Sequence, residues 1–309
     1  MNEQPFDALS VAHEFIGASM SVLPIKADGS KKPSLRSWKK YQNRLATDAE
    51  IKAWFGSGEA GIAVVGGKVS GNLLILDFDK DAEVVFAQFR DKVERESPGL
   101  IGRLPLVRTP SGGAHLFCRT TGNCPGNAKL AQRPTNQDSP KQKHDTLIET
   151  RGNGGYVLTI GSPSSCHPSG KKYVHDSLTP WPWLTPVIDD EELDTLLTVA
   201  TSFDDMPVKT VEPPKRPATS EGARPGDEYN RRGDALALLL KHGWTVCREH
   251  GGVTYLTRPG KTRGESATFG HCRTKDGVPL LRNFSTSSGL DLKAYSPFSL
   301  FAHLECGGD

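Results

Sequence analysis

The sequence has no long hydrophobic run, and this absence excludes one class of protein at the outset. No apolar stretch in the 309 residues approaches the roughly 18–20 residues that a membrane-crossing helix needs. The N-terminal segment MNEQPFDALSVAHEF also lacks the basic start and apolar core of a secretory signal. A soluble, cytoplasmic protein without a membrane partner is therefore expected.

Paired cysteines and an excess of charge of one sign are also missing. The six cysteines include no CxxC pair, so free thiols are expected in a cytosolic chain. Cys118, Cys124, His144 and either Cys166 or His167 offer ligands for zinc, but their spacing matches no zinc motif, and zinc is not expected. The net charge of +2 neither favours nor excludes nucleic acid, because acidic metal sites offset basic grooves.

The predicted elements favour an α/β or α+β fold. Helical spacing occurs over residues 8–20 and 81–96, and residues 47–55 begin with a capping-box pattern. Between residues 104 and 173, apolar runs separated by glycine-rich turns predict two hairpins, PLVRTPSGGAHLFCR and TLIETRGNGGYVLTIGS. Mixed helices and strands indicate a layered fold.

A change of composition predicts two domains. Residues 206–226 are rich in Pro, Glu and Lys, which is typical of a linker. The sequence therefore predicts a large domain at residues 1–205 and a small α+β domain at residues 227–309, a division that suits the length. The small domain is expected to open with a helix over residues 230–242, followed by short strands such as VTYLTR.

The strongest local signal is LLILDFDKD, an apolar run that ends in two carboxylates. The run predicts a buried strand, and Asp77 and Asp79, two positions apart, project from one face of it. Adjacent carboxylates repel each other unless a cation lies between them, and Mg²⁺ prefers such oxygen ligands. The alternative is a pair of solvated acids at a strand-to-helix turn.

Two glycine-rich segments add candidate phosphate contacts. In TPSGGAHLF, a turn with bare backbone precedes His115 on the returning strand, although an ordinary hairpin turn explains this segment equally simply. In IETRGNGGYVL, Glu149 and Arg151 share one strand face, as a plain ion pair also would. Together, these acids, the histidine and the arginine are what two-metal phosphoryl transfer uses.

The order LDFD, TPSGGAH and ETRGNGGYVL followed by HPSG resembles the archaeo-eukaryotic primase superfamily, most closely the bifunctional DNA primase/polymerase domains of phages, plasmids and other mobile elements. The resemblance covers residues 8–185. It implies packed β-sheet units with an RNA-recognition-like core. It also implies a DNA primase and DNA-directed polymerase that makes primers de novo and extends them on single-stranded DNA. Its substrates would be nucleoside triphosphates and its cofactors Mg²⁺ or Mn²⁺ in a two-metal site.

The resemblance also implies roles for individual residues. The catalytic, metal-binding acids would be Asp77, Asp79 and Glu149. Many relatives have aspartate at the third of these positions, where this chain has glutamate. The nucleotide-binding residues would be Ser111, Gly112, Gly113, His115 and Arg151.

The C-terminal domain is predicted to bind template or primer rather than ATP. The segment RPGKT lacks the first glycine of a P-loop, because position 255 is Tyr255. Basic residues near aromatic ones are typical of single-strand binding, and a solvated basic surface is the alternative. The candidate nucleic-acid contacts are Arg258, Lys261 and Arg263. The chain ends without a motor, so a helicase domain or protein is a further candidate partner.

Other functions would use the same residues differently. A metal-dependent nuclease needs water and no nucleoside triphosphate, so nucleotide binding would distinguish it. A catalytically inert single-strand-binding module of a replication protein would have no reason to keep clustered, repulsive acids. A sugar-nucleotide transferase usually places its DxD motif in a loop. The basic loop around Lys31, with Trp38 and Lys39, is expected to coat the surface.

Overall fold

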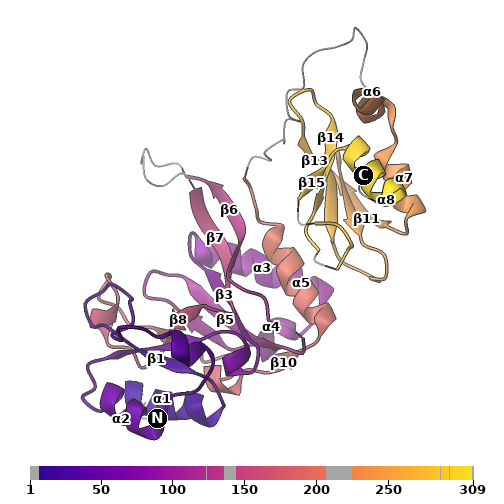
Figure 1. Ribbon diagram of the computed structural model, residues 1–309. Coiled ribbons are helices and arrows are strands. Elements are labelled where there is room, and N and C mark those ends of the chain that lie inside the picture. Colours follow the sequence, from indigo (N-terminus) through magenta and orange to yellow (C-terminus); the bar gives the residue numbers. More distant parts are fainter. Residues whose placement is uncertain are drawn as a thin grey trace. The chain divides into compact units, whose positions relative to one another are not determined.

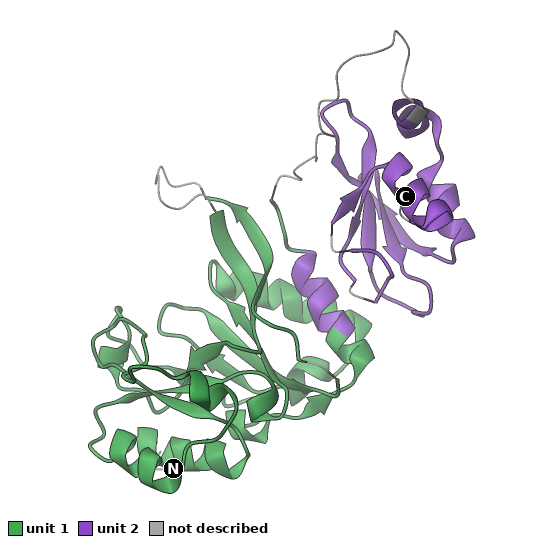
Figure 2. Cartoon of the chain, in the orientation of Figure 1, with its two compact units in different colours: residues 1–193, 203–205 green, residues 194–202, 206–309 purple. Residues whose placement is uncertain are grey.

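The computed structural model in Figure 1 contains two compact units, each built from helices and mainly antiparallel sheets. It describes residues 7–122, 124–135, 144–206, 225–285, 287–291 and 293–307. The units comprise residues 1–193 with 203–205, and residues 194–202 with 206–309 (Figure 2). The α+β prediction is confirmed. Most of the predicted linker, residues 207–224, lies outside the described residues.

The first layer of unit 1 is a small antiparallel sheet of order β1-β2-β8, with helices packed beside it. Its strands are β1 (Val22–Ile25), β2 (Gly61–Val65) and β8 (Tyr156–Leu158). Every residue of β1 and β2 is buried, as expected for continuous apolar runs. Two helices, α1 (Ala8–Gly17) and α2 (Asp48–Phe55), contribute the apolar faces that cover this core.

The N-terminus of α2 confirms the capping-box prediction. The Thr47 side chain accepts a hydrogen bond from the Glu50 amide, and the Glu50 side chain accepts one from the Thr47 amide. These bonds satisfy amide groups that a helix start leaves free. In contrast, Asp81, which precedes helix α3 (Ala82–Glu96), has φ of 49° and makes no side-chain cap bond.

The second layer of unit 1 is a seven-stranded sheet of order β6-β7-β3-β5-β4-β9, with β10 paired to β5. Its strands are β3 (Leu73–Phe78), β4 (Leu106–Arg108), β5 (Ala114–Thr120), β6 (Ala128–Pro134), β7 (His144–Arg151), β9 (Val174–His175) and β10 (Val187–Ile188). Short helical turns connect these elements: η1 (Lys39–Gln42), η2 (Lys68–Ser70), η3 (Ser164–Cys166), η4 (Pro182–Leu184) and α4 (Leu100–Arg103).

Helix α3 (Ala82–Glu96) packs on one face of this sheet through aromatic side chains (Figure 1). The ring of Phe78 lies 5.1 Å from that of Phe86 and 5.0 Å from that of Phe89, measured between centroids. All three are buried. Because side chains alternate along β3, a Phe78 that packs on the helix leaves Asp77 on the opposite face.

One predicted hairpin is confirmed and the other is wrong. TPSGGAHLF joins β4 to β5 as antiparallel neighbours. The turn after ETR, in contrast, carries the chain from β7 in the large sheet to β8 in the small one. The turn packs closely against the loop before β6, since a Cβ on Gly152 would lie 1.9 Å from the Pro125 carbonyl oxygen. Local spacing cannot show which strand a segment pairs with.

Unit 2 contains a five-stranded antiparallel sheet of order β11-β12-β13-β14-β15. Its strands are β11 (Thr245–His250), β12 (Val253–Thr257), β13 (Ala267–Arg273), β14 (Pro279–Asn283) and β15 (Ala294–Tyr295). The predicted helix over residues 230–242 is instead two helices, α6 (Pro225–Arg232) and α7 (Ala235–Lys241). Gly233 lies at the break, where a Cβ would clash with the Tyr229 carbonyl at 2.6 Å.

Helices α7 and α8 (Pro297–Cys306) cover one face of this sheet (Figure 1). Their core includes Leu239, Trp244, Leu281 and Leu300. Helix α5 (Asp190–Thr201) contains the division between the two units, after residue 193. No helix in the described part of the chain is long and apolar enough to cross a membrane.

Candidate active site

Three of the predicted site residues lie side by side at one level of the seven-stranded sheet. Asp77 of β3 is directly opposite His115 of β5 on one side and opposite Glu149 of β7 on the other. Residues directly opposite each other in antiparallel strands point to the same face. Strand register therefore brings an acid, a histidine and a second acid from three separate segments into one row.

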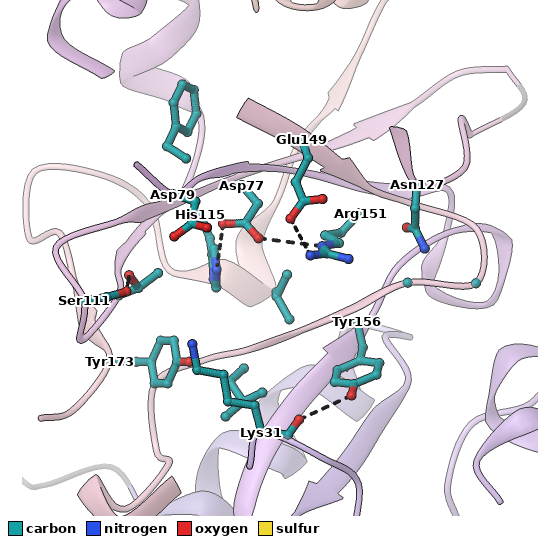
Figure 3. Close-up of a pocket in the computed structure, with 16 residues that line it drawn as sticks. Lys31, Asp77, Asp79, Ser111, His115, Asn127, Glu149, Arg151, Tyr156 and Tyr173 are labelled. Atoms are coloured by element: carbon teal, nitrogen blue, oxygen red, sulfur yellow. Dashed lines mark hydrogen bonds and ion pairs between the residues drawn. The ribbon is translucent and has the colours of Figure 1, made fainter. Parts of the chain in front are cut away.

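This row lines a cleft of about 320 Å³ within unit 1 (Figure 3). Strands of the large sheet contribute the carboxylates and His115, while β8 and the loop after β1 contribute the other side. The polar residues of the lining are Lys31, Asp77, Asp79, Thr109, Ser111, His115, Asn127, Glu149, Arg151, Tyr156 and Tyr173. The cleft thus contains most of the residues predicted to bind metal or nucleotide.

Asp77 is held between a histidine and an arginine side chain. One carboxylate oxygen lies 3.5 Å from Nε2 of His115, and the other lies 3.6 Å from Nε of Arg151. Burial works to raise the pKa of Asp77, but His115 and Arg151 outweigh it and lower that pKa below its usual value. Asp77 is therefore ionised near neutral pH.

The other two acids behave in the opposite way. Burial is the main reason that the pKa of Asp79 is raised, and the charge of Asp77 raises it further. Burial also raises the pKa of Glu149. The charge of Arg151 opposes this effect, and the charges of Asp77 and Asp79 raise the pKa further. The charge of Asp77 thus raises the pKa of both other carboxylates, and a divalent cation bound among the three would relieve that repulsion.

Arg151 already neutralises part of this charge. Its guanidinium forms an ion pair with Glu149 as well as with Asp77 (Figure 3). As the side chains stand, the residues described in the structure contain no group of three or more His, Cys, Asp or Glu that could hold a metal ion. Carboxylates are suitable ligands for a divalent cation, so the chemistry of the acids fits such an ion. In the present arrangement Arg151 neutralises two of them, Asp77 and Glu149.

The glycine turn before His115 differs in detail from a phosphate cradle. The Gly112 amide donates to the Thr109 carbonyl at 3.0 Å, and the Gly113 amide donates to Thr109 Oγ1 at 2.9 Å. Gly112 has φ of +87°, which favours glycine, and a Cβ on Gly113 would lie 2.5 Å from the Phe78 carbonyl oxygen. The two glycines therefore shape the turn, and Thr109 and Ser111 are its members that line the cleft.

Four other residues of the lining were not predicted to contribute to the site. Lys31, expected on the surface, lines the cleft, as do Asn127, Tyr156 and Tyr173. The Tyr173 ring stacks on His115 with centroids 6.0 Å apart. Tyr156 lies in the motif ETRGNGGYVL and Tyr173 follows HPSG after two lysines, so both carried a signal. Lys31 and Asn127 reach the cleft through loop paths that spacing alone does not predict.

The predicted nucleic-acid contacts of unit 2 are placed differently from one another. Arg263 is exposed. The Arg258 and Lys261 side chains are 14% and 2% exposed, and each has a nitrogen 3.5 Å from Oδ2 of Asp194. Ser285 also donates to that carboxylate at 2.8 Å. In this structure Arg258 and Lys261 are thus committed to a buried ionic cluster rather than presented to a ligand.

The residues considered for zinc do not form one site. Cys118 and Cys166 belong to β5 and η3, in different layers of unit 1, and both are buried. His144 begins β7 at the end opposite Arg151 and is exposed. Burial raises the pKa of the Cys124 thiol to about 11, so it is protonated at neutral pH rather than a ready thiolate ligand.

Comparison with protein families identifies a match over the first part of the chain. The family described as bifunctional DNA primase/polymerase, N-terminal, matches residues 12–183, which is more than half of the 309 residues. A search of curated proteins finds no match to the chain. The matched span contains the whole cleft lining, from Lys31 to Tyr173. The chain therefore belongs to the bifunctional DNA primase/polymerase family, whose activity is nucleotidyl transfer with DNA and nucleotides as substrates and which is generally dependent on divalent metal.

Proposed function

We propose that the chain is a template-dependent nucleotidyltransferase that starts primers on single-stranded DNA and then extends them. The observation that carries the proposal is the row of Glu149, Asp77 and His115 across three neighbouring strands, facing one cleft. Family membership supports the reaction type, and the row supports where in the chain it occurs.

In the proposed reaction, a hydroxyl oxygen of the primer or of a first nucleotide forms a bond to the α-phosphorus of the incoming nucleotide. The bond from that phosphorus to the pyrophosphate oxygen breaks, and pyrophosphate leaves with the charge. The hydroxyl proton passes to solvent. Such a transfer is catalysed mainly by positioning and by neutralisation of charge, so no general-base side chain is required.

The acids Asp77, Asp79 and Glu149 would hold Mg²⁺ or Mn²⁺. Two such ions, when bound, make the attacking hydroxyl more acidic and neutralise charge on the leaving phosphates. Glu149 is longer than the aspartate that is common at this position, and its carboxylate still lines the cleft. Arg151 would have to exchange its carboxylate partners for phosphate oxygens, which guanidinium groups bind in the same forked geometry.

His115 is positioned to contact the nucleotide phosphates from the other side of Asp77. Its side chain is only 7% exposed, and its orientation is restrained by Asp77 and by the stacked ring of Tyr173. A preoriented N–H donor stabilises charge on a phosphate more effectively than a mobile one, because little reorganisation accompanies the reaction.

A priming assay tests this proposal. The purified chain is incubated with single-stranded DNA, Mg²⁺ or Mn²⁺ and labelled nucleotides, first without and then with a primer. The double variant Asp77→Asn/Asp79→Asn is compared with wild type, and Asp91→Asn, an exposed acid of α3, is the matched control. We expect labelled oligomers from wild type and from the control only.

The remaining outcomes separate the competing functions. Extension of a supplied primer without de novo synthesis would reject primer initiation and leave polymerase activity. A folded wild-type protein that makes no product under either condition would reject the proposal. Degradation of the template instead would indicate a metal-dependent nuclease. Retained activity in the double variant would reject the placement of the metal site.

A further inference from the structure

Lys31 lies on the side of the cleft opposite the row of acids (Figure 3). From its placement we propose that Lys31 binds the phosphates of the incoming nucleotide beyond the α-phosphate, the ones that leave as pyrophosphate. The inference rests on the proposed function, since it takes the cleft to be the binding site of a nucleoside triphosphate. It adds a residue that neither the motif order nor the family match assigns.

The backbone around Lys31 forms a closed turn. The Lys26 amide donates to the Lys32 carbonyl at 3.0 Å, and Ile25 forms a bridge with Pro33. Lys31 itself has φ of +59°, in the left-handed region that a residue with a Cβ adopts at a cost. A glycine would satisfy the turn more easily, so a lysine at this position points to a role for the side chain.

Two neighbours hold the turn against the cleft. The Tyr156 hydroxyl donates to the Lys31 carbonyl at 3.3 Å, and the Tyr156 ring is in turn braced edge-to-face by Trp38 at 5.3 Å. On the other side, a Cβ on Gly29 would lie 3.6 Å from the Pro168 backbone, so the turn packs against the loop that follows η3. The lysine is therefore presented from a supported loop rather than from a free one.

The charge of Lys31 is available to a ligand. No ion pair within 4.0 Å involves its ammonium among the residues that the structure describes, and the residue is exposed. Arg151, the other cation in the lining, already pairs with both Asp77 and Glu149. Lys31 therefore offers an unpaired positive charge to a highly charged anion that enters the cleft.

The position of this charge relative to the acids decides which phosphates it would meet. Asp77 and Asp79 both line the cleft, and Figure 3 shows the Lys31 side chain on the side opposite them. Asp79 follows the last residue of β3, one step beyond the row that contains Asp77. An α-phosphate at the Asp77 row would leave the more distant phosphates extending toward Asp79, where Lys31 lies on the other side.

A comparison of two nucleotides tests the assignment. Dissociation constants for dATP and dAMP are measured by calorimetry with Mg²⁺ and without DNA, for wild type, Lys31→Ala, Lys31→Arg and Lys32→Ala. Lys32 is the matched control, since it is the adjacent exposed lysine and does not line the cleft. Loss of one charge-assisted contact predicts at least about tenfold weaker dATP binding by Lys31→Ala. Binding of dAMP should not change, Lys31→Arg should retain most of the affinity, and Lys32→Ala should resemble wild type.

Primer extension by the same variants completes the test, with Lys31→Ala expected to raise KM for the nucleotide. Equal dATP binding by Lys31→Ala and wild type would overturn the inference, and so would a loss of equal size for dAMP. If wild type extends primers while Lys31→Ala binds dATP normally, only this inference fails. If wild type binds dATP in a Lys31-dependent way but transfers no nucleotide, only the proposed reaction fails. A wild type that binds no dATP would overturn both.

Discussion

The pairing of Arg151 with two acids makes a testable prediction about metal binding. Arg151→Gln removes the charge that neutralises Asp77 and Glu149, but keeps a polar, shorter side chain. Without metal, three carboxylates then share a cleft with less compensation, so the variant should be less stable than wild type. Divalent cation should restore more of the stability in the variant, since in wild type it must displace or share the role of Arg151.

The magnitude follows from burial. The Asp77 and Glu149 side chains are 17% and 15% exposed, whereas Arg151 is 34% exposed. A hydrogen bond to a charged group contributes about 1.5–3 kcal/mol when well shielded. Solvent screening at the exposed guanidinium reduces this to about 1–2 kcal/mol, which is about 2–8 °C in Tm for a domain near 200 residues.

Thermal unfolding with and without Mg²⁺ measures the effect. The matched control is Arg133→Gln, because Arg133 is also 34% exposed and also pairs with two acids, Asp81 and Asp145, but does not line the cleft. We expect a similar loss of Tm in both variants without metal. Only Arg151→Gln should gain extra stability from Mg²⁺. An equal Mg²⁺-induced shift in wild type and Arg151→Gln would refute the view that this arginine and the ion neutralise the same acids.

Three further predictions concern pH, the core and the glycine turn. Burial first and neighbouring acids second raise the pKa of Asp79 and Glu149, so protons compete with metal. The Mg²⁺-induced shift in Tm should therefore shrink as pH falls from 8 toward the range just above ordinary carboxyl pKa values, about 4–4.5, and a constant shift would contradict this. Without metal, Asp79 and Glu149 stabilise the folded state at the lowest pH of this series, because they hold their protons more tightly when folded. This stabilisation is lost as the pH rises through their raised pKa values. Phe89→Ala deletes a fully buried ring between α3 and the large sheet and should lower the free energy of unfolding by about 3–5 kcal/mol in urea titrations; a loss under about 1.5 kcal/mol would show that the site collapses around the cavity. Gly113→Ala places a Cβ 2.5 Å from a backbone carbonyl of β3 and should reduce primer extension at least tenfold, while Gly102→Ala, which has open space, should behave as wild type.

The sequence was sufficient to predict the strand that carries Asp77, because the signal for that strand is local. Asp77 and Asp79 end an apolar run, which identifies both the strand and the face, and the structure confirms that strand as β3 (Leu73–Phe78). The helix after it, α3, is also where its apolar spacing predicts it. Periodicity and burial are properties of one segment, so a single segment is enough to reveal them.

Contacts between distant segments were beyond that kind of reasoning. The strand after ETR was predicted to fold back as a hairpin, yet β8 pairs with β2 of the other sheet. Arg258 and Lys261 look basic and available in the sequence, but Asp194, far away in the chain, pairs with both. Lys31 shows the reverse case, since a charged loop that resembles ordinary surface reaches the cleft. Partner choice depends on the whole fold, and spacing within a segment carries little information about it.

The arrangement of the acids depends on residues that have no chemical role. A shift of one residue in the pairing of β7 with β3 would turn Glu149 to the other face, away from Asp77. The same shift would expose Ile148, which is fully buried and lies opposite Phe78 in the present register. The cost of exposing such a side chain, about 1.5–3 kcal/mol, holds the register in place. The apolar face of the sheet therefore determines which carboxylates meet in the cleft, although the acids themselves repel one another.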